Sequence, residues 1–262
     1  MNQDLQGRIA IVTGASAGIG EATARELASR GCRVVLNARR EDRLRALAAE
    51  LPKGASAIVA GDCADAGVVE NLAHACVKNF GTDADLLVAN AGRGLGGTAI
   101  TSDAAQWDEM IRTNILGVSR QIRAIAPRML ARFADSDVTL RGAWTKAPRD
   151  IIILGSVVGR HVSPFSSFYS CTKAAVQTLA EGTRRELGPK GVRVTLVEPG
   201  FVTSEFQGVA GYKPEWYAQT VEMLGPVLEP ADIARAIAFI AAQPAHVHVS
   251  DILIRPTRQD YP

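Results

Sequence analysis

Cysteine and histidine are scarce in this sequence, and neither is clustered. Four cysteines stand far apart with no Cys-x-x-Cys pair among them: Cys32, Cys63, Cys76 and Cys171. Disulfide frameworks and zinc sites need cysteines at short, repeated spacings, so neither is expected. The histidines at positions 161, 246 and 248 have no cluster of carboxylates nearby in the sequence. We therefore expect no metal site and interpret these histidines as surface or packing residues.

Long apolar runs and an excess of one charge are also missing. No stretch reaches about 18 consecutive apolar residues, the length that a membrane-spanning helix needs, and the N-terminus lacks the pattern of a secretory signal. The 29 basic and 27 acidic residues nearly cancel, which argues against binding nucleic acid through bulk charge. We expect a cytoplasmic protein with no nucleic-acid or membrane partner.

The apolar residues that are present are numerous enough for a large core. They make up 47% of 262 residues, too many for a disordered protein. No repeat, low-complexity tract or linker divides the chain. Single α/β domains of about 250 residues are common, so one domain over residues 1–262 is expected.

Short apolar runs alternate with longer amphipathic stretches along the chain. The expected strands are Ile9–Val12, Val34–Leu36, Ala57–Val59, Leu86–Ala89, Ile151–Leu154, Val192–Val197 and Ile252–Ile254. The expected helices are Ile19–Arg30, Glu41–Glu50, Val68–Asn79, Ala104–Phe133, Tyr169–Leu187 and Ala231–Ala242. Strands that are apolar throughout are typical of parallel sheets buried on both faces. The pattern predicts an α/β fold with a doubly wound parallel β-sheet, the Rossmann fold.

Two segments depart from this alternation. Residues from about 135 to 150 form a polar insertion that is long for a helix–strand connection. It is interpreted as a surface excursion, with a substrate lid or a subunit contact as the alternative. Residues from about 203 to 226 form a turn-rich loop and helix region after the sixth strand. This region is expected on the substrate side, where such segments are often mobile.

A glycine-rich turn, TGASAGIG at Thr13–Gly20, joins the first expected strand to the first helix. Glycines let backbone N–H groups approach a pyrophosphate, and the helix N-terminus adds a partial positive charge. The spacing is GxxxGxG rather than the usual GxGxxG, and glycine also gathers in ordinary turns. The position between a strand and a helix favours a dinucleotide site. Its expected contacts are Gly14, Ser16, Gly18, Ile19 and Gly20.

The end of the second strand indicates which dinucleotide is bound. Enzymes that prefer NAD place a carboxylate here for the ribose 2′-hydroxyl, whereas this chain has Ala38 and Arg39. A guanidinium suits a 2′-phosphate, so Asn37, Arg39 and Arg40 are expected to face NADP(H). The alternative is that both arginines lie in solvent at a helix N-terminus, an unfavourable place for cations.

Two further strand ends supply expected cofactor contacts. Asp62 and Cys63 follow the third strand, where Asp62 either accepts from an adenine amino group or opens a helix. Asn90, Ala91 and Gly92 follow the fourth strand. Small residues there let the backbone pass close to the cofactor.

Proton-transfer chemistry is indicated by Ser156, Tyr169 and Lys173. Tyr169 and Lys173 are four residues apart, so they share one face of a helix. A phenol ionises near pH 10, about three units too high for easy proton exchange at neutral pH, and an adjacent ammonium lowers its pKa. Ser156 follows the fifth strand and can donate to the same carbonyl oxygen. Open α/β sheets bind ligands at this edge.

With these motifs in place, the chain resembles the short-chain dehydrogenase/reductase family over nearly its whole length. The resemblance rests on TGASAGIG, Asn90-Ala-Gly92, Asn114-Ile-Leu-Gly117, Ser156, Tyr169-Ser-Cys-Thr-Lys173 and Pro199-Gly200. It implies a catalytic tetrad of Asn114, Ser156, Tyr169 and Lys173, in which Asn114 holds a water that relays protons to Lys173. It also implies cofactor contacts from Tyr169, Lys173, Pro199, Gly200, Val202 and Ser204. The family usually has threonine where Ser204 stands.

A finer resemblance lies at the C-terminus. The run His246–Gln259 looks like the ending of a subgroup that includes NADP-dependent 3-hydroxy acid (serine) dehydrogenases, sulfoacetaldehyde reductases and clavulanic aldehyde reductase. The polar insertion at about 135–150 departs from that subgroup. Members of the family are usually dimers or tetramers, which implies a homodimer or homotetramer with contacts through helices Ala104–Phe133 and Tyr169–Leu187.

The combined prediction is an NADPH-dependent carbonyl reductase or alcohol dehydrogenase that acts on a small molecule. The alternative is a catalytically silent NADP-binding redox sensor or scaffold, which would be expected to lose Tyr169 or Lys173. Nearness to the motifs suggests these pocket residues: Arg93, Leu95, Val157, Val158, Phe165, Phe168, Phe201 and Phe206. This set is largely apolar and favours a neutral carbonyl; Arg93 or Arg160 holding an anionic substrate is the alternative.

Overall fold

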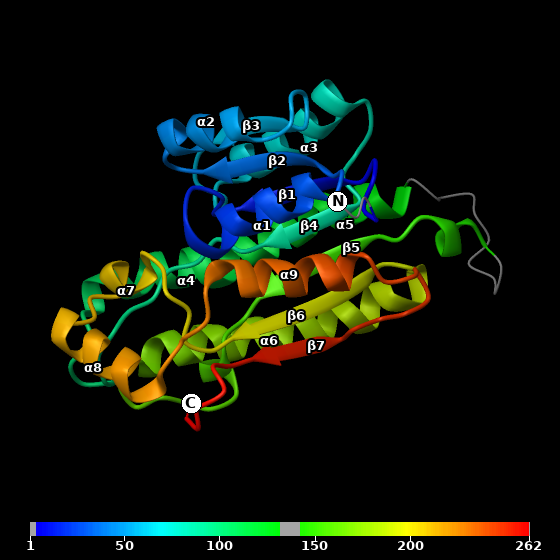
Figure 1. Ribbon diagram of the computed structural model, residues 1–262. Helices are drawn as coiled ribbons and strands as arrows, with labels where there is room; N and C mark the ends of the chain where they lie inside the picture. Colours follow the sequence, from blue (N-terminus) through cyan, green and yellow to red (C-terminus); the bar gives the residue numbers. More distant parts are fainter. Residues whose placement is uncertain (1–3, 132–141, 262) are drawn as a thin grey trace.

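Seven parallel strands form one sheet through the middle of the molecule (Figure 1). The computed structural model describes residues 4–131 and 142–261. The strands are β1 (Ile9–Thr13), β2 (Arg33–Ala38), β3 (Ser56–Ala60), β4 (Leu86–Ala89), β5 (Asp150–Leu154), β6 (Arg193–Pro199) and β7 (Asp251–Ile254). Their order across the sheet is β3-β2-β1-β4-β5-β6-β7. The predicted doubly wound parallel sheet is confirmed, and each strand lies within one or two residues of its predicted bounds.

Helices cover both faces of the sheet, and each face has its own apolar core. One core lies beneath α1 (Gly18–Ser29), α2 (Glu41–Glu50) and α9 (Pro230–Ala241). The other lies beneath α3 (Ala66–Phe80), α5 (Val118–Ala131) and α6 (Ser167–Leu187). The strand order reverses between β1 and β4. In open α/β sheets, the carboxyl ends of the strands at such a reversal form the crevice that binds ligands.

The helix predicted over Ala104–Phe133 is interrupted. The described part consists of η1 (Ala104–Gln106), α4 (Trp107–Ile111), a π-helical turn η2 (Arg112–Gly117) and α5, and its last two residues lie outside the described residues. A π turn inserts an extra residue into the helical ladder and turns side chains to new directions. Here it contains Asn114, which is buried. Apolar periodicity alone does not reveal such a local change of pitch.

The region after β6 contains two short helices, α7 (Phe206–Val209) and α8 (Pro214–Leu224). Pro214 stands at the first turn of α8, where its missing N–H costs nothing. Gly225 ends the helix with φ of 77°, a backbone conformation that favours glycine. Both helices lie beyond the carboxyl ends of the strands, at the end to which the strand arrows point (Figure 1).

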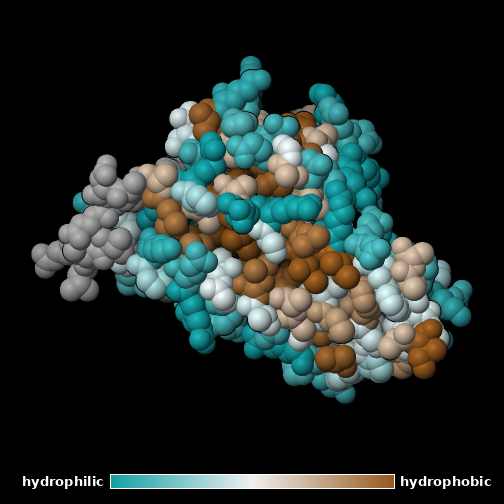
Figure 2. All heavy atoms as spheres, turned by 180° about the vertical axis from the view of Figure 1, so that it is seen from behind, coloured by the Kyte–Doolittle hydropathy of each residue, from teal (hydrophilic) through white to brown (hydrophobic). Residues whose placement is uncertain are grey.

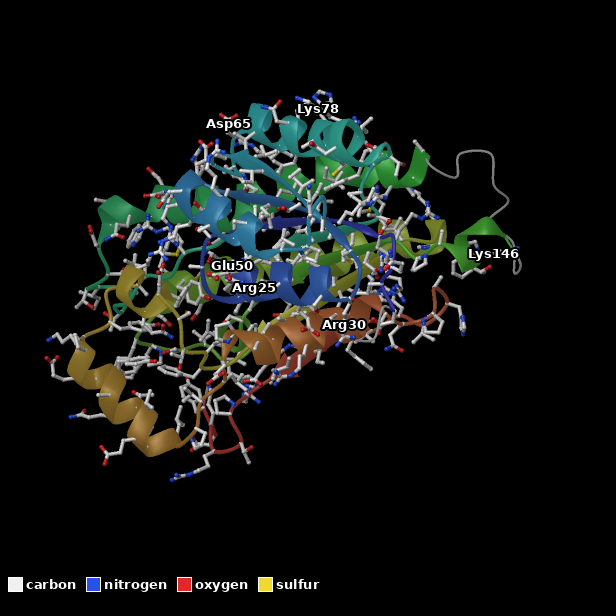
Figure 3. The ribbon with its side chains drawn as sticks, turned by 45° about the horizontal axis from the view of Figure 1, so that its top comes forward. Arg25, Arg30, Glu50, Asp65, Lys78 and Lys146 are labelled. Carbon is white, nitrogen blue, oxygen red and sulfur yellow. The ribbon has the colours of Figure 1, made fainter. Side chains whose placement is uncertain are left out.

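The described part of the polar insertion lies at the opposite end of the sheet. It contains η3 (Ala143–Lys146) just before β5. A side chain on Gly191, just before β6, would meet Trp144 Cβ at 3.0 Å. Lys146, in η3, lies at the end of the molecule opposite to α8 (Figure 3). This part of the insertion does not cover the crevice; residues 135–141 are outside the described chain.

Polar contacts stabilise helix ends in both helical layers. Asp65 caps α3, because its carboxylate accepts hydrogen bonds from the N–H groups of Gly67 and Val68. Arg25 on α1 forms an ion pair of 2.7 Å with Glu50 at the end of α2 (Figure 3). The cap stabilises the first turn of α3, and the ion pair joins α1 to α2.

A buried ion-pair network lies at the amino ends of the strands. Arg8 pairs with Asp85 at 2.7 Å and with Asp150 at 2.8 Å, and Arg193 pairs with Asp150 at 2.7 Å. The carboxylate of Asp150 is fully buried between the two guanidinium groups. The guanidinium of Arg193 also donates to backbone carbonyls between α9 and β7. The network therefore joins β1, β5, β6 and the C-terminal segment at the edge away from the crevice.

Candidate active site

The glycine-rich turn is shaped for a close approach to its backbone. Gly14 has φ of 69°, and a Cβ there would lie 2.7 Å from Asn90 Nδ2. A Cβ on Gly20 would collide with the carbonyl of Gly14. The N-cap residue of α1, Ala17, makes no side-chain cap, so the first N–H groups of the helix keep their capacity to bind an anion. The residues present fit a dinucleotide pyrophosphate.

The other residues of this turn frame the same space. Ile19 packs on the core beneath α1. The Ser16 hydroxyl accepts a hydrogen bond of 3.1 Å from Arg40 Nη2. A Cβ on Gly18 would meet Ser204 Cβ at 3.3 Å, so the segment after β6 lies directly over the turn.

Asn90 holds the turn after β4 in place. Its Nδ2 donates to the Thr13 carbonyl at 2.8 Å. The Thr13 hydroxyl accepts from the N–H groups of Asn90 at 3.1 Å and Ala91 at 3.2 Å. The Nδ2 and backbone N–H of Asn90 are thus engaged within the protein, and the backbone of Ala91 and Gly92 borders the crevice.

Both arginines after β2 are paired with carboxylates. Arg39 is 74% exposed at its side chain and lies 3.3 Å from Glu109. Arg40 lies 2.9 Å from Glu205, in the segment after β6. Both side chains thus remain exposed to solvent, each with a carboxylate partner. Asn37 is fully buried, and its Nδ2 donates to the carbonyls of Val59 and Gly61, so it fixes the β2–β3 edge rather than facing the crevice.

Asp62 and Cys63 lie where the third strand ends. Burial opposes the charge of Asp62, but the hydrogen bond from the Ala64 N–H and the guanidinium of Arg112 together lower its pKa below the usual value. Asp62 therefore stays ionised at neutral pH. Burial raises the pKa of the Cys63 thiol to about 12, so this thiol stays protonated.

The structure brings Ser156, Tyr169 and Lys173 together at the carboxyl end of β5. Tyr169 and Lys173 lie one turn apart on α6, with Lys173 Nζ 5.9 Å from the centre of the Tyr169 ring. The phenol of Tyr169 is hydrogen bonded to the Ser156 side chain. Lys173 Nζ donates to the Leu154 carbonyl at 2.7 Å. All three thus share one small volume beside the crevice, as the sequence spacing predicts.

Asn114 joins the turn after β4 to α6. Its Oδ1 accepts from the Arg93 N–H at 2.9 Å, and its Nδ2 donates to the Arg93 carbonyl at 2.9 Å and to the Thr172 hydroxyl at 3.0 Å. A Cβ on Gly92 would lie 3.3 Å from Asn114 Oδ1 and 3.6 Å from Lys173 Nζ. The side-chain amide of Asn114 therefore positions the loop next to Lys173.

Burial dominates the ionisation of the two central groups. It raises the pKa of Tyr169 well above the usual phenol value; the nearby Tyr212 adds to the rise, and the hydrogen bond with Ser156 opposes it. Burial also lowers the pKa of Lys173 to about 8. The expected lowering of the phenol pKa by Lys173 is not seen in the protein alone; burial, which disfavours the charged phenolate, is the largest cause of the shift. Tyr169 is therefore a protonated phenol at neutral pH.

The turn after β6 is anchored by the C-terminal run. Gln259 Oε1 accepts from the Phe201 N–H at 2.9 Å and fills the space that a side chain on Gly200 would need. Pro199 ends β6, and Val202 is buried beside it. The Ser204 hydroxyl accepts from the Phe206 N–H at 3.2 Å. These residues form one wall of the crevice next to the glycine turn.

Apolar and aromatic side chains form the other wall. Leu95, Met110, Val157, Val158 and Tyr169 make one buried cluster, with Trp107, Phe168 and Phe206 packed against it. The ring centres of Tyr169 and Phe206 are 5.5 Å apart. Of the predicted pocket residues, Phe165 is 70% exposed and does not join this cluster. The prediction of pocket residues missed Trp107 and Met110 of α4 and Tyr212; only for Tyr212 was there a signal, the aromatic residues of the turn-rich segment 203–226.

Neither arginine suggested for an anionic substrate is left uncompensated. Arg93 pairs with Glu109 and also hydrogen bonds to Gln106. Arg160 pairs with Glu198 at 2.6 Å and with Asp251 at 2.9 Å. Arg160 thus has two carboxylate partners, whereas Arg93 shares the carboxylate of Glu109 with Arg39.

Within residues 4–131 and 142–261, no group of three or more His, Cys, Asp or Glu side chains is arranged to hold a metal ion. His248 instead hydrogen bonds to the backbone of Val194. No helix of this part of the chain is long and apolar enough to cross a membrane.

The sequence and the fold have counterparts among known proteins. Residues 8–213 match the family model of the short chain dehydrogenases. An uncharacterized oxidoreductase from Staphylococcus saprophyticus is 34% identical over 256 residues, which cover 97% of this chain and 99% of that protein.

Two solved structures with a bound dinucleotide share the fold. A closed form of serine dehydrogenase complexed with NADP+ has a TM-score of 0.85 and 30% identity, and the match covers 97% of this chain and 96% of that one. A 3-ketoacyl-(acyl-carrier-protein) reductase from Brucella melitensis complexed with NADH has a TM-score of 0.84 and 25% identity, covering 97% and 99%. The chain belongs to the short-chain dehydrogenase family of oxidoreductases.

Proposed function

We propose that this protein is an NADPH-dependent carbonyl reductase or alcohol dehydrogenase, with Tyr169 as its general acid and base. The main support for the proposal is one observation. Ser156, Tyr169 and Lys173 lie together at the carboxyl end of β5, at the same edge of the sheet as the glycine turn. A nicotinamide dinucleotide, when bound, supplies the hydride for reduction or accepts it in oxidation.

The residues of this chain divide the remaining work. Tyr169, protonated because it is buried, donates its proton to the carbonyl oxygen as negative charge develops there. Ser156 donates a hydrogen bond to the same oxygen and orients the carbonyl. Lys173 stabilises the phenolate that Tyr169 leaves behind. Asn114 holds the loop against Lys173. The family resemblance implies that it also holds a water that relays protons to Lys173.

The preference for NADP(H) is proposed to come from Arg39 and Arg40. Both directly follow β2, and no carboxylate stands at the strand end, where an enzyme that prefers NAD has one. Forked guanidinium donors match a phosphate. The serine dehydrogenase neighbour was solved with NADP+ and the ketoacyl reductase neighbour with NADH, which supports a nicotinamide cofactor in general.

The protein is further proposed to act in the cytoplasm as a homodimer or homotetramer. Figure 2 shows apolar atoms gathered across the middle of the face on which α5 and α6 lie. Ile111 and Leu116, in the interrupted helix before α5, are 37% and 42% exposed. Exposed apolar surface of this kind favours a contact with a second subunit.

A panel of aldehydes and ketones tests the proposal directly. We expect NADPH oxidation with at least one neutral carbonyl compound and slower oxidation of NADH. Tight NADPH binding without turnover on any member of the panel would favour the silent redox sensor instead.

A further inference from the structure

The segment after β6 places a second phenol beside Tyr169. Phe206 packs against the Tyr169 ring and against the backbone of Gly94. The Gly96 N–H donates to the Ala210 carbonyl at 2.8 Å, so this segment is hydrogen bonded to the loop that follows β4. Tyr212 stands just past this contact.

The ring of Tyr212 is held on two sides. A Cβ on Gly96 would meet two of its ring carbons at 3.4 Å, so the ring packs against the loop backbone. Trp216 contacts it edge to face, with ring centres 5.0 Å apart. The Tyr212 N–H donates to the Gln207 carbonyl at 3.0 Å. A side chain held in this way presents its hydroxyl at a fixed place.

The hydroxyl of Tyr212 makes no hydrogen bond to any described residue. Burial raises the pKa of Tyr212, so the group remains a neutral donor. Its ring packs on the same loop after β4 as Phe206, whose ring centre is 5.5 Å from that of Tyr169. A partly buried phenol that no described residue binds, on the loop that borders the crevice, is placed to bind something that enters it.

The surrounding groups limit what that ligand is. Leu95, Val158 and Phe206 make the wall apolar. Arg160 pairs with Glu198 and Asp251, and Arg93 pairs with Glu109, which also pairs with Arg39. An apolar wall with one phenol donor suits a neutral oxygen, whereas a carboxylate or sulfonate would lose its hydration against the same wall.

We propose that Tyr212 is a substrate-positioning residue, and that the substrate is a neutral carbonyl compound with an oxygen substituent next to the carbonyl: a hydroxyketone, diketone or ketoester. The Tyr212 hydroxyl binds the substituent oxygen while Ser156 and Tyr169 hold the carbonyl oxygen. This inference rests on the proposed reductase function and names the substrate class of that site.

Paired substrates test it: each ketone is compared with its analogue that carries a hydroxyl on the adjacent carbon. The measured quantity is the ratio of kcat/KM for the two. We expect the wild type to favour the hydroxylated partner by about tenfold, one hydrogen bond's worth, and Tyr212→Phe to bring the ratio close to one. Tyr217→Phe is the matched control, because that hydroxyl already bonds to Thr203 at 3.3 Å within the same segment; its ratio stays that of the wild type.

The possible results separate the two proposals. No turnover of any carbonyl by the wild type contradicts the reductase function itself. Turnover with equal kcat/KM for both partners, or a ratio that Tyr212→Phe leaves unchanged, overturns the role of Tyr212 alone. NADPH titration and thermal unfolding show that the variant is folded, and Tyr212→Leu replaces it in the same comparison if it is not.

Discussion

Arg40 and Glu205 form an ion pair of 2.9 Å that joins the end of β2 to the segment after β6. Arg40 also donates to the Ser16 hydroxyl of the glycine turn. The residue proposed to contact the 2′-phosphate is thus linked to the segment that carries Phe206 and Tyr212. A phosphate at this place would compete with the Glu205 carboxylate for the same guanidinium.

Removing that carboxylate is expected to strengthen NADPH binding. Glu205→Gln releases Arg40 and takes a negative charge away from the phosphate. Exposed pairs of this kind contribute about 0.2–1 kcal/mol, so the Kd for NADPH should fall by up to about fivefold while that for NADH changes little. Fluorescence titration measures both. Glu222→Gln, on exposed α8, is the control; an unchanged or weaker NADPH affinity in Glu205→Gln would contradict the competition.

Arg39 is expected to carry much of the discrimination between the two dinucleotides. Arg39→Ala should lower the preference for NADP over NAD by at least about tenfold, the effect of losing one charge-assisted hydrogen bond. The comparison is kcat/KM with each cofactor, with Arg45→Ala as a control on the exposed face of α2. An unchanged preference would mean that another group reads the 2′-phosphate.

The pH dependence of reduction should follow Lys173. Burial lowers its pKa to about 8, so the ammonium is present below that pH and lost as the pH rises through it. Tyr169 stays protonated throughout this range, because burial raises its pKa. We expect kcat/KM for reduction, which reports the free enzyme, to be flat below pH about 8 and to fall above it. A rate that rises above that pH would contradict the role of the ammonium.

The buried network at the amino ends of the strands should matter for stability and not for cofactor binding. Asp150→Ala leaves the guanidinium groups of Arg8 and Arg193 buried without this partner. Loss of one partner of a buried pair costs about 3–5 kcal/mol, which chemical denaturation should detect. Glu181→Gln, in an exposed pair with Arg184 and Arg185, should change stability little. A loss of NADPH affinity in folded Asp150→Ala would contradict the separation of the two edges.

The sequence predictions that the structure confirmed came from local patterns. Apolar runs such as Ile151–Leu154 predict buried parallel strands, and the spacing of Tyr169 and Lys173 places both on one helical face. The glycine turn needs only its own neighbours and the following helix. Each of these features depends on residues that are close in the sequence.

Features that depend on distant segments could not be predicted. The partners of Arg39, Arg40 and Arg93 are glutamates that the fold brings from other elements. The π turn around Asn114 follows no apolar period. The raised pKa of Tyr169 arises mainly from its burial in the folded chain, which the spacing of Tyr169 and Lys173 does not reveal.

The central claim is that the Tyr169 hydroxyl transfers the proton, and Tyr169→Phe tests it most directly. The variant keeps the ring and its packing against Phe206 but has no proton to give. Stopped-flow measurement of NADPH oxidation, alongside an NADPH titration of the same sample, separates chemistry from binding. The account predicts that turnover is abolished while the Kd for NADPH stays near that of the wild type; turnover at the wild-type rate would contradict it.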